Sequence, residues 1–390
     1  MTDYVSGVNP DVLRWARESS GFSLQEVARF LKKEEAAVIQ WETGEASPTY
    51  VQLEKLAYNL YRRPVAVFFF PEPPLEPDAT ESFRTLPEFE IANLIPDTKH
   101  ALREAQAMQM ALRELSGGQN TSEKQLLKDV HVDPSDDIPS IAKFVRRYLE
   151  IPLYQQEKWR SADKALHEWR EAVEDSGIYV FKRSFKQSDV SGFCLQDDEF
   201  PIIYLNNSAA KYRQIFSLFH ELAHVLLQTS GVTKLNDRYV AQLSGEAQDI
   251  EVFCNRFASE FLIPSTDFNS RLKEDETPEE TAERLSEHYK VSREVVLRRL
   301  LDKGTIDESY YHGRVAEWNE RFEVNRREQK GGGNYYNNQV TYLGRKFLTL
   351  AFSRFHSGHV SFDELAGYLN VKPKSIPDLE KQVLGSISSR

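Results

Sequence analysis

Cysteine is scarce in this 390-residue chain. Its two cysteines, Cys194 and Cys254, lie far apart in the sequence and outside any C-x-x-C pattern. This spacing argues against a disulfide framework, and a reducing cytosol is the expected compartment.

Long hydrophobic runs are also missing. The longest run, VAVFFF at residues 65–70, is far too short for a helix that spans a bilayer. The first ten residues lack the charged-then-apolar layout of a signal peptide. We therefore expect a soluble, cytoplasmic protein that does not use a membrane as its partner.

The chain has no excess of positive charge. Its formal net charge of −11 argues against a protein that coats nucleic acid or anionic membrane over its whole surface, although a local DNA contact stays open. Its hydrophobic content of 40% and aromatic content of 12% are enough for packed cores, which excludes a disordered chain.

Changes in composition divide the chain into regions. The proline-rich stretch PEPPLEPDA at residues 71–79 cannot be helical and marks a boundary. We predict a helix-turn-helix domain at 1–70, a linker and helical region at 71–160, a domain with a sheet at 161–315, and a C-terminal helical segment at 336–390.

Strand and helix patterns alternate in the middle of the chain. Three short runs predict strands at residues 177–181, 191–195 and 200–206, the last two joined by the polar turn QDDE. Longer helical patterns follow at 210–228 and 246–262. The expected fold class is mainly α with a small β-sheet, an α+β arrangement. The strand at 200–206 either accepts an extended substrate by strand addition or is an ordinary sheet strand.

The chain contains an internal similarity. Residues 23–42 and 361–380 align without gaps, and each begins with Ser-x-x-Glu, the capping box of a helix start. A weaker third copy lies at 282–300. All three predict a helix, a turn and a helix. Such hairpins are common packing units, so the repeat alone assigns no function.

The stretch FSLFHELAHVLLQ at residues 216–228 carries the clearest chemical signal. His220 and His224 lie four residues apart, so both imidazoles leave one face of a helix and can reach one tetrahedral ion. Glu221 is placed to act as general base toward an attacking water. Two histidines and a carboxylate in an otherwise apolar helix would be costly to bury without a metal.

A catalytic zinc needs a third protein ligand. Because no histidine follows within ten residues, we expect a carboxylate from the helix at 246–262, where the candidates are Glu246, Asp249, Glu251 and Glu260. Glu251 lies four residues before Asn255, which could brace it. Spacing alone leaves Glu251 only modestly ahead of Asp249 and Glu246.

These motifs resemble a known family. HELAHVLL followed by EVFCNRFASEFLIP is similar to the ImmA/IrrE family of zinc metallopeptidases, which pairs H-E-x-x-H with E-x-x-[AC]-N-x-[FV]-A. The resemblance implies a zincin-like domain over about 160–315, with Zn²⁺ held by His220, His224 and Glu251 and with Glu221 as the catalytic base. It also implies a narrow protein substrate, of repressor or antitoxin type and encoded nearby, in a stress, mobile-element or phage-defence switch.

Residues 21–57 resemble the XRE-type, lambda-repressor-like helix-turn-helix, in which the second helix reads the major groove. Here Glu34 and Glu35 would face phosphates, and residues 1–70 hold eight Lys or Arg against nine Asp or Glu. The region could recognise a partner protein instead. The alternative function is therefore a DNA-binding regulator or an antitoxin-like binding protein whose metal site is vestigial or sensory.

Overall fold

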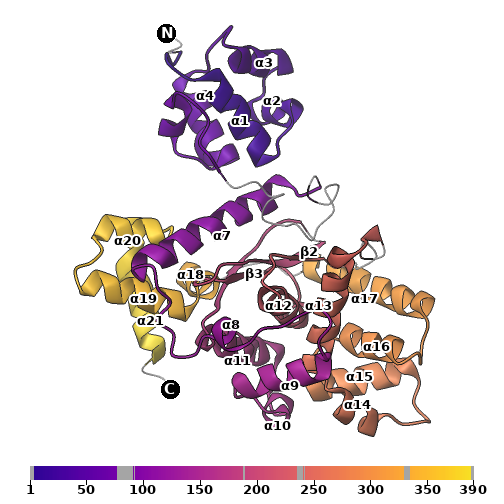
Figure 1. The fold of residues 1–390 in the computed structure, drawn as a ribbon. Coiled ribbons are helices and arrows are strands. Elements are labelled where there is room, and N and C mark those ends of the chain that lie inside the picture. Colours follow the sequence, from indigo (N-terminus) through magenta and orange to yellow (C-terminus); the bar gives the residue numbers. More distant parts are fainter. Residues whose placement is uncertain are drawn as a thin grey trace. The chain divides into compact units, whose positions relative to one another are not determined.

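The computed structural model describes residues 4–76, 91, 93–187, 189–234, 240, 242–328 and 334–387. The described residues up to Glu104 form one compact unit, and those from Ala105 onward form a second. The expected fold class is confirmed, because the chain is mainly helical with one small mixed sheet (Figure 1). Among the described helices, none has the length and apolar character needed to cross a bilayer.

The first unit is built from short helices, of which α1 (Pro10–Ser20), α2 (Leu24–Leu31) and α4 (Tyr50–Glu54) begin with a side-chain cap. Ser23 and Glu26 form the capping box that the sequence predicts. Val12, Val27 and Leu53 are fully buried in its core. Helix α3 (Glu35–Thr43) lies between α2 and α4 in the chain, and α4 is followed by a π-helical segment at Lys55–Tyr61 and a 3-10 segment at Val65–Phe69. The proline-rich segment is non-helical over 73–76, and residues 77–79 lie outside the described part.

The second unit surrounds its sheet with helices. Its hydrophobic core extends from Leu126 to Tyr311, so side chains on both sides of residue 160 share it. Helix α7 (Pro96–Leu115) contributes residues to both units. The helices that follow are α8 (Leu126–Asp129), α9 (Ile138–Tyr148), α10 (Leu153–Glu157), α11 (Ala162–Asp175), α12 (Lys211–Leu226), α13 (Glu246–Leu262), α14 (Ser265–Arg271), α15 (Pro278–Tyr289), α16 (Arg293–Asp302), α17 (Glu308–Glu328), α18 (Tyr335–Leu343), α19 (Arg345–His356), α20 (Phe362–Tyr368) and α21 (Ile376–Ile387).

The sheet has the strand order β1-β3-β2-β4. Strands β1 (Tyr179–Arg183) and β3 (Ile202–Asn206) are parallel, whereas β2 (Val190–Leu195) is antiparallel to β3 and to β4 (Val232–Lys234). Because β3 is paired on both sides, it is an ordinary internal strand, and the strand-addition alternative for residues 200–206 is wrong. The sequence did not predict β4, which is only three residues long.

Alternation along the strands separates two buried faces. Val180, Ile203 and Leu205 join the core that contains α11 and α12. On the other face, Tyr204 stacks on Phe193 with ring centroids 5.1 Å apart, and Phe181 meets Phe347 of α19 edge-on at 5.4 Å. Helices therefore cover both faces of the sheet.

The C-terminal segment is anchored at the β1 end of the sheet. Arg170 of α11 pairs with buried Glu174 at 3.1 Å and donates to the carbonyl of Thr341 in α18 at 2.6 Å. The expected capping box of Ser361 and Glu364 forms at the start of α20. Helices α20 and α21 follow each other through a 3-10 turn at Pro373–Ser375, which gives the helix, turn and helix that the repeat predicts.

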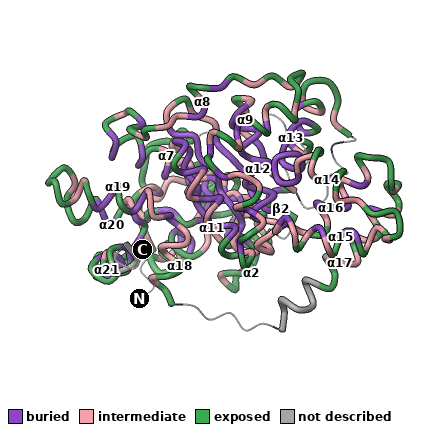
Figure 2. The backbone as a smooth tube through the Cα atoms, turned by 90° about the horizontal axis from the view of Figure 1, so that it is seen from below, coloured by how far each residue is buried: buried purple, intermediate pink, exposed green. Residues whose placement is uncertain are grey.

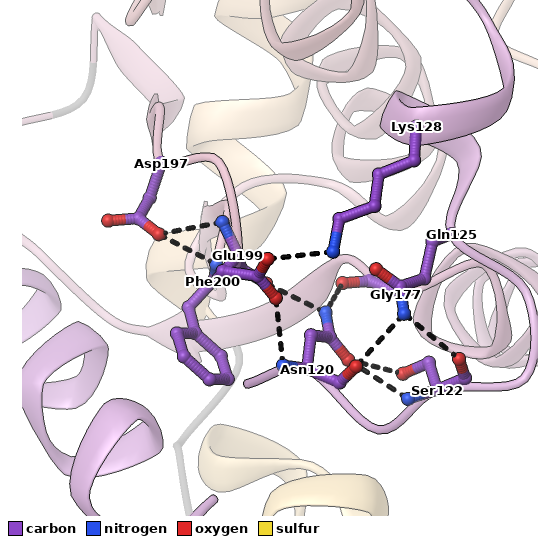
Figure 3. A network of polar contacts seen from close by, with 8 residues as sticks. All are labelled: Asn120, Ser122, Gln125, Lys128, Gly177, Asp197, Glu199 and Phe200. Atoms are coloured by element: carbon purple, nitrogen blue, oxygen red, sulfur yellow. Dashed lines mark hydrogen bonds and ion pairs between the residues drawn. The ribbon is translucent and has the colours of Figure 1, made fainter. Parts of the chain in front are cut away.

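A polar network ties the loop after α7 to the β2–β3 turn (Figure 3). The Asn120 amide donates to the carbonyls of Gly177 at 2.7 Å and Glu199 at 2.8 Å. The Glu199 carboxylate in turn accepts from the Asn120 backbone at 2.9 Å and from Lys128 at 2.7 Å. Gly177 has φ +94°, and a Cβ there would lie 3.0 Å from the Lys124 carbonyl, so glycine is required at this corner. The network joins three segments that are distant in sequence.

We expect Asn120→Ala to destabilise the second unit. Removing the amide leaves the carbonyls of Gly177 and Glu199 without this donor, at a cost of about 2 kcal/mol. That loss corresponds to a fall of about 3 °C in the midpoint of thermal unfolding for this large unit, which extends from Ala105 onward. The neighbouring exposed Gln119 provides the control, because Gln119→Ala should leave the midpoint unchanged. Equal midpoints for the two variants would contradict a stabilising role for the network.

Candidate metal centre

Helix α12 carries His220, Glu221 and His224. Every residue from Gln214 to Leu226 is buried, and buried residues gather around α11, α12 and α13 (Figure 2). Phe219 stacks on Phe261 of α13 with ring centroids 4.1 Å apart, and Trp169 of α11 meets Phe219 edge-on at 4.9 Å. These apolar contacts fix the rotation of α12 about its axis and thereby the direction of its polar side chains.

Three donor side chains converge where α12 packs on α13. His220, His224 and Glu251 are buried, with ligand atoms close enough to hold one metal ion. The two Nε2 atoms lie 3.2 Å apart, and the Glu251 carboxylate oxygens lie 3.5 Å from His220 Nε2 and 3.3 Å from His224 Nε2. Donors bound tetrahedrally at about 2.0–2.2 Å from zinc lie about 3.3–3.6 Å from one another. The spacing therefore fits an ion of this size.

Thr229 fixes the orientation of the second histidine. Its hydroxyl donates to the His224 backbone carbonyl at 3.1 Å, and its oxygen lies 3.2 Å from His224 Nδ1. Because the hydroxyl proton is used on the carbonyl, the oxygen accepts from Nδ1–H, which leaves a lone pair on Nε2. This is the tautomer that a metal ligand needs.

Gly231 packs directly against the same imidazole. A Cβ at this position would lie 2.4 Å from His224 Cδ2 and 2.5 Å from its Nε2. No side chain fits there without displacing the ring or the start of β4. Glycine thus allows the backbone to close over the histidine.

Glu221 points toward β4. Its Oε1 accepts from the Thr233 backbone N–H at 2.8 Å and also from the Thr233 hydroxyl. Its buried Oε2 has no hydrogen-bond partner within the part of the chain that the structure describes. Thr233 thus holds one oxygen of this carboxylate in place.

The site favours positive charge between its donors. Burial raises the pKa of Glu251, but His224 and His220 outweigh this and hold its pKa well below the usual range. Burial lowers the pKa of His224, whereas Cys254 and Glu251 raise it, and the net result is well above the ordinary value. A divalent cation supplies the charge that this carboxylate attracts.

The remaining carboxylates named from the sequence lie elsewhere. Glu246 and Asp249 are exposed, and Glu260 pairs with Arg299 at 2.7 Å. Asn255 is half-buried and lines a pocket beside Phe216, so its role in bracing Glu251 stays a prediction. Sequence reasoning missed Thr229, Gly231 and Thr233, because none belongs to a spaced motif and each acts through a tertiary contact.

Comparison with known families agrees with this geometry. Residues 173–301 match the Peptidase_M78 family, described as the IrrE N-terminal-like domain. The matched segment contains His220, Glu221, His224 and Glu251, and it does not reach the helices of the first unit. No curated protein matches the chain.

The ligand assignment predicts a specific pattern of metal loss. The purified protein should hold about one zinc per chain, and His220→Ala or His224→Ala should lose most of it, because two donors cannot hold the ion tightly. Glu251→Ala should weaken binding, whereas the exposed Asp249→Ala and Glu246→Ala should not. Metal content by inductively coupled plasma mass spectrometry measures this. Metal loss in Asp249→Ala with retention in Glu251→Ala would show that the assignment is wrong.

Proposed function

We propose that this chain is a zinc-dependent endopeptidase that performs limited proteolysis of a regulatory protein. The main support is the buried set of His220, His224 and Glu251, whose donor atoms are 3.2–3.5 Å apart, together with Glu221, which directly follows His220 in the chain. The match of residues 173–301 to an IrrE N-terminal-like domain supports the same reaction class.

In this mechanism, His220, His224 and Glu251 would hold the zinc. When bound, zinc supplies a Lewis acid that acidifies water and polarises a peptide carbonyl. Glu221 takes a proton from the attacking water on Oε2 and later returns it to the leaving amine. A C–O bond forms as the C–N bond breaks, which yields a carboxylate and an amine. Thr233 keeps Glu221 Oε1 in place throughout.

The proposed substrate is a cytoplasmic protein of repressor or antitoxin type, encoded near this chain, in a stress, mobile-element or phage-defence switch. The helices of the first unit are suited to selecting it. Glu35 lies in the first turn of α3, and Ile39 of that helix is 44% exposed. An acidic start and an exposed apolar side chain suit a protein surface better than DNA phosphates.

A DNA-binding regulator with a vestigial or sensory metal site is the second candidate. The observation in its favour is the pair of α2, which a capping box begins, and α3, which together have the helix, turn and helix of many DNA readers. The exposed Glu34 and Glu35 at the start of α3 weigh against it.

Glu221→Gln separates an enzyme from a binding protein. The substitution keeps size and polarity but removes the proton acceptor, so the variant should fold, keep its zinc and still bind its partner. Cleavage of the repressor- or antitoxin-type protein from the adjoining reading frame should fall by on the order of a hundredfold or more. Electrophoresis of the co-incubated proteins measures it, with exposed Glu246→Gln as control. Wild-type cleavage by zinc-loaded Glu221→Gln would end this proposal.

The charge of the first unit predicts weak DNA binding. The full chain should bind duplex DNA from its own promoter weakly or not at all at physiological salt, because Glu34 and Glu35 oppose phosphate contact. Fluorescence anisotropy across a salt series tests this. The double variant Glu34→Gln, Glu35→Gln should bind more tightly. Nanomolar, sequence-specific binding by the wild-type chain would favour the regulator.

A further inference from the structure

A pocket whose lining residues are half charged lies beside the metal centre, within the second unit. It takes side chains from α12, β4, α13, α16 and α17, so five elements distant in sequence form one concave surface. The lining residues are Arg213, Phe216, Lys234, Asn255, Glu294, Val295, Arg298 and Tyr311.

Three lining residues of the pocket lie close in the chain to residues of the metal centre. Phe216 lies one helical turn before His220, with the two ring centroids 6.3 Å apart. Asn255 lies one turn after Glu251 on α13, and Lys234 directly follows the Thr233 that holds Glu221. A peptide bound at the metal centre would therefore pass next to this lining.

Positive charge dominates the lining. Arg213, Lys234 and Arg298 contribute three cations, and Glu294 contributes the one carboxylate among the lining residues that the structure describes. Glu294 pairs with Arg213 at 3.4 Å. Among the ion pairs between described residues, Lys234 pairs with Asp189 at 3.5 Å and Arg298 pairs with Asp302 at 3.4 Å, and neither acid belongs to the lining.

These cations are shielded from water. The side-chain exposure is 7% for Lys234, 12% for Arg213 and 26% for Arg298. Screening by solvent is weaker at such depth, so a further carboxylate would be attracted more strongly here than at an open surface.

Aromatic walls hold the two guanidinium groups in place. Arg298 lies over the Tyr311 ring at 5.7 Å, and Arg213 lies over the Phe216 ring at 5.9 Å. Phe216 and Tyr311 are buried, so these surfaces are fixed before any ligand arrives. Preorganised guanidinium groups on aromatic faces suit planar carboxylate recognition.

We propose that this pocket is a subsite for a carboxylate of the peptide substrate, supplied by an aspartate or glutamate side chain close to the scissile bond. The inference rests on the proposed peptidase function and adds a substrate preference to it. A free C-terminal carboxylate has the same chemistry, and the experiment below separates the two sources.

Three peptide hydroxamates of equal length test the subsite without requiring turnover. A hydroxamate binds zinc directly. Calorimetric titration of the zinc-loaded full chain therefore measures an affinity to which both the metal and the pocket contribute. The first compound carries a glutamate side chain and a C-terminal amide, the second a glutamine and an amide, and the third a glutamine and a free C-terminal carboxylate. The glutamate compound should bind about tenfold more tightly than the neutral one.

Matched arginines on α16 provide the variants. Arg298→Gln should reduce the tenfold preference to nearly equal binding, and Lys234→Gln should reduce it as well. Arg293→Gln should retain it, because Arg293 pairs with Glu283 at 2.9 Å, lies over Trp318 and is not part of the lining. The comparison of compounds on the wild-type chain needs no variant, so a variant that misfolds leaves the test intact.

The outcomes separate the two proposals. Preference for the third compound over the neutral one would retain the carboxylate subsite but assign it to a chain terminus, which overturns the side-chain source. Equal binding of all three would overturn the subsite and leave the peptidase proposal standing. If no compound binds the zinc-loaded chain, the zinc is not accessible to a ligand. Both the peptidase proposal and the subsite proposal would then be wrong.

Discussion

The packing of α12 against α13 is the contact on which the candidate centre depends. One helix brings two imidazoles and the other brings a carboxylate, and the stacked rings of Phe219 and Phe261 hold the two helices at a fixed distance and rotation. Donor spacings of 3.2–3.5 Å leave little tolerance for sliding between these helices. The apolar side of the interface therefore sets the geometry of its polar side, and burial of three ionisable groups without a cation would work against that packing.

Sequence alone predicted much of this arrangement. The four-residue spacing in HELAH required a shared helix face, and the positions of α12, α13 and three strands follow from periodicity. Spacing put Glu251 only modestly ahead of Asp249 and Glu246, and the family resemblance decided for Glu251. The structure then places it beside both histidines and leaves Glu246 and Asp249 exposed.

Other parts could not be predicted because they depend on contacts between distant segments. A three-residue strand such as β4 has no usable period, and only its pairing with β2 defines it. Whether a strand lies at the edge or inside a sheet is decided by its neighbours, which is why the role of β3 stayed open until its partners were known. Asn120 illustrates the same limit, since its partners Gly177 and Glu199 lie far along the chain.

The two edge strands of the sheet, β1 and β4, make different contacts. At the β1 end, α18 and the buried pair of Arg170 and Glu174 cover a strand that would otherwise present open backbone groups. At the β4 edge, the Thr233 N–H donates to the Glu221 side chain of α12. The first arrangement protects the fold, and the second links the sheet to the proposed base.

The close approach of Gly231 to His224 gives a criterion for deciding which sequences can fold in the same way around the second histidine. A glycine seven positions after the second histidine marks where the chain turns back over the imidazole, because any Cβ there would overlap the ring. A chain that keeps both histidines but has a bulky residue at this position must route its return strand differently. The spacing of that glycine is thus a steric criterion, independent of the ligands themselves, for choosing among chains with the same two-histidine helix.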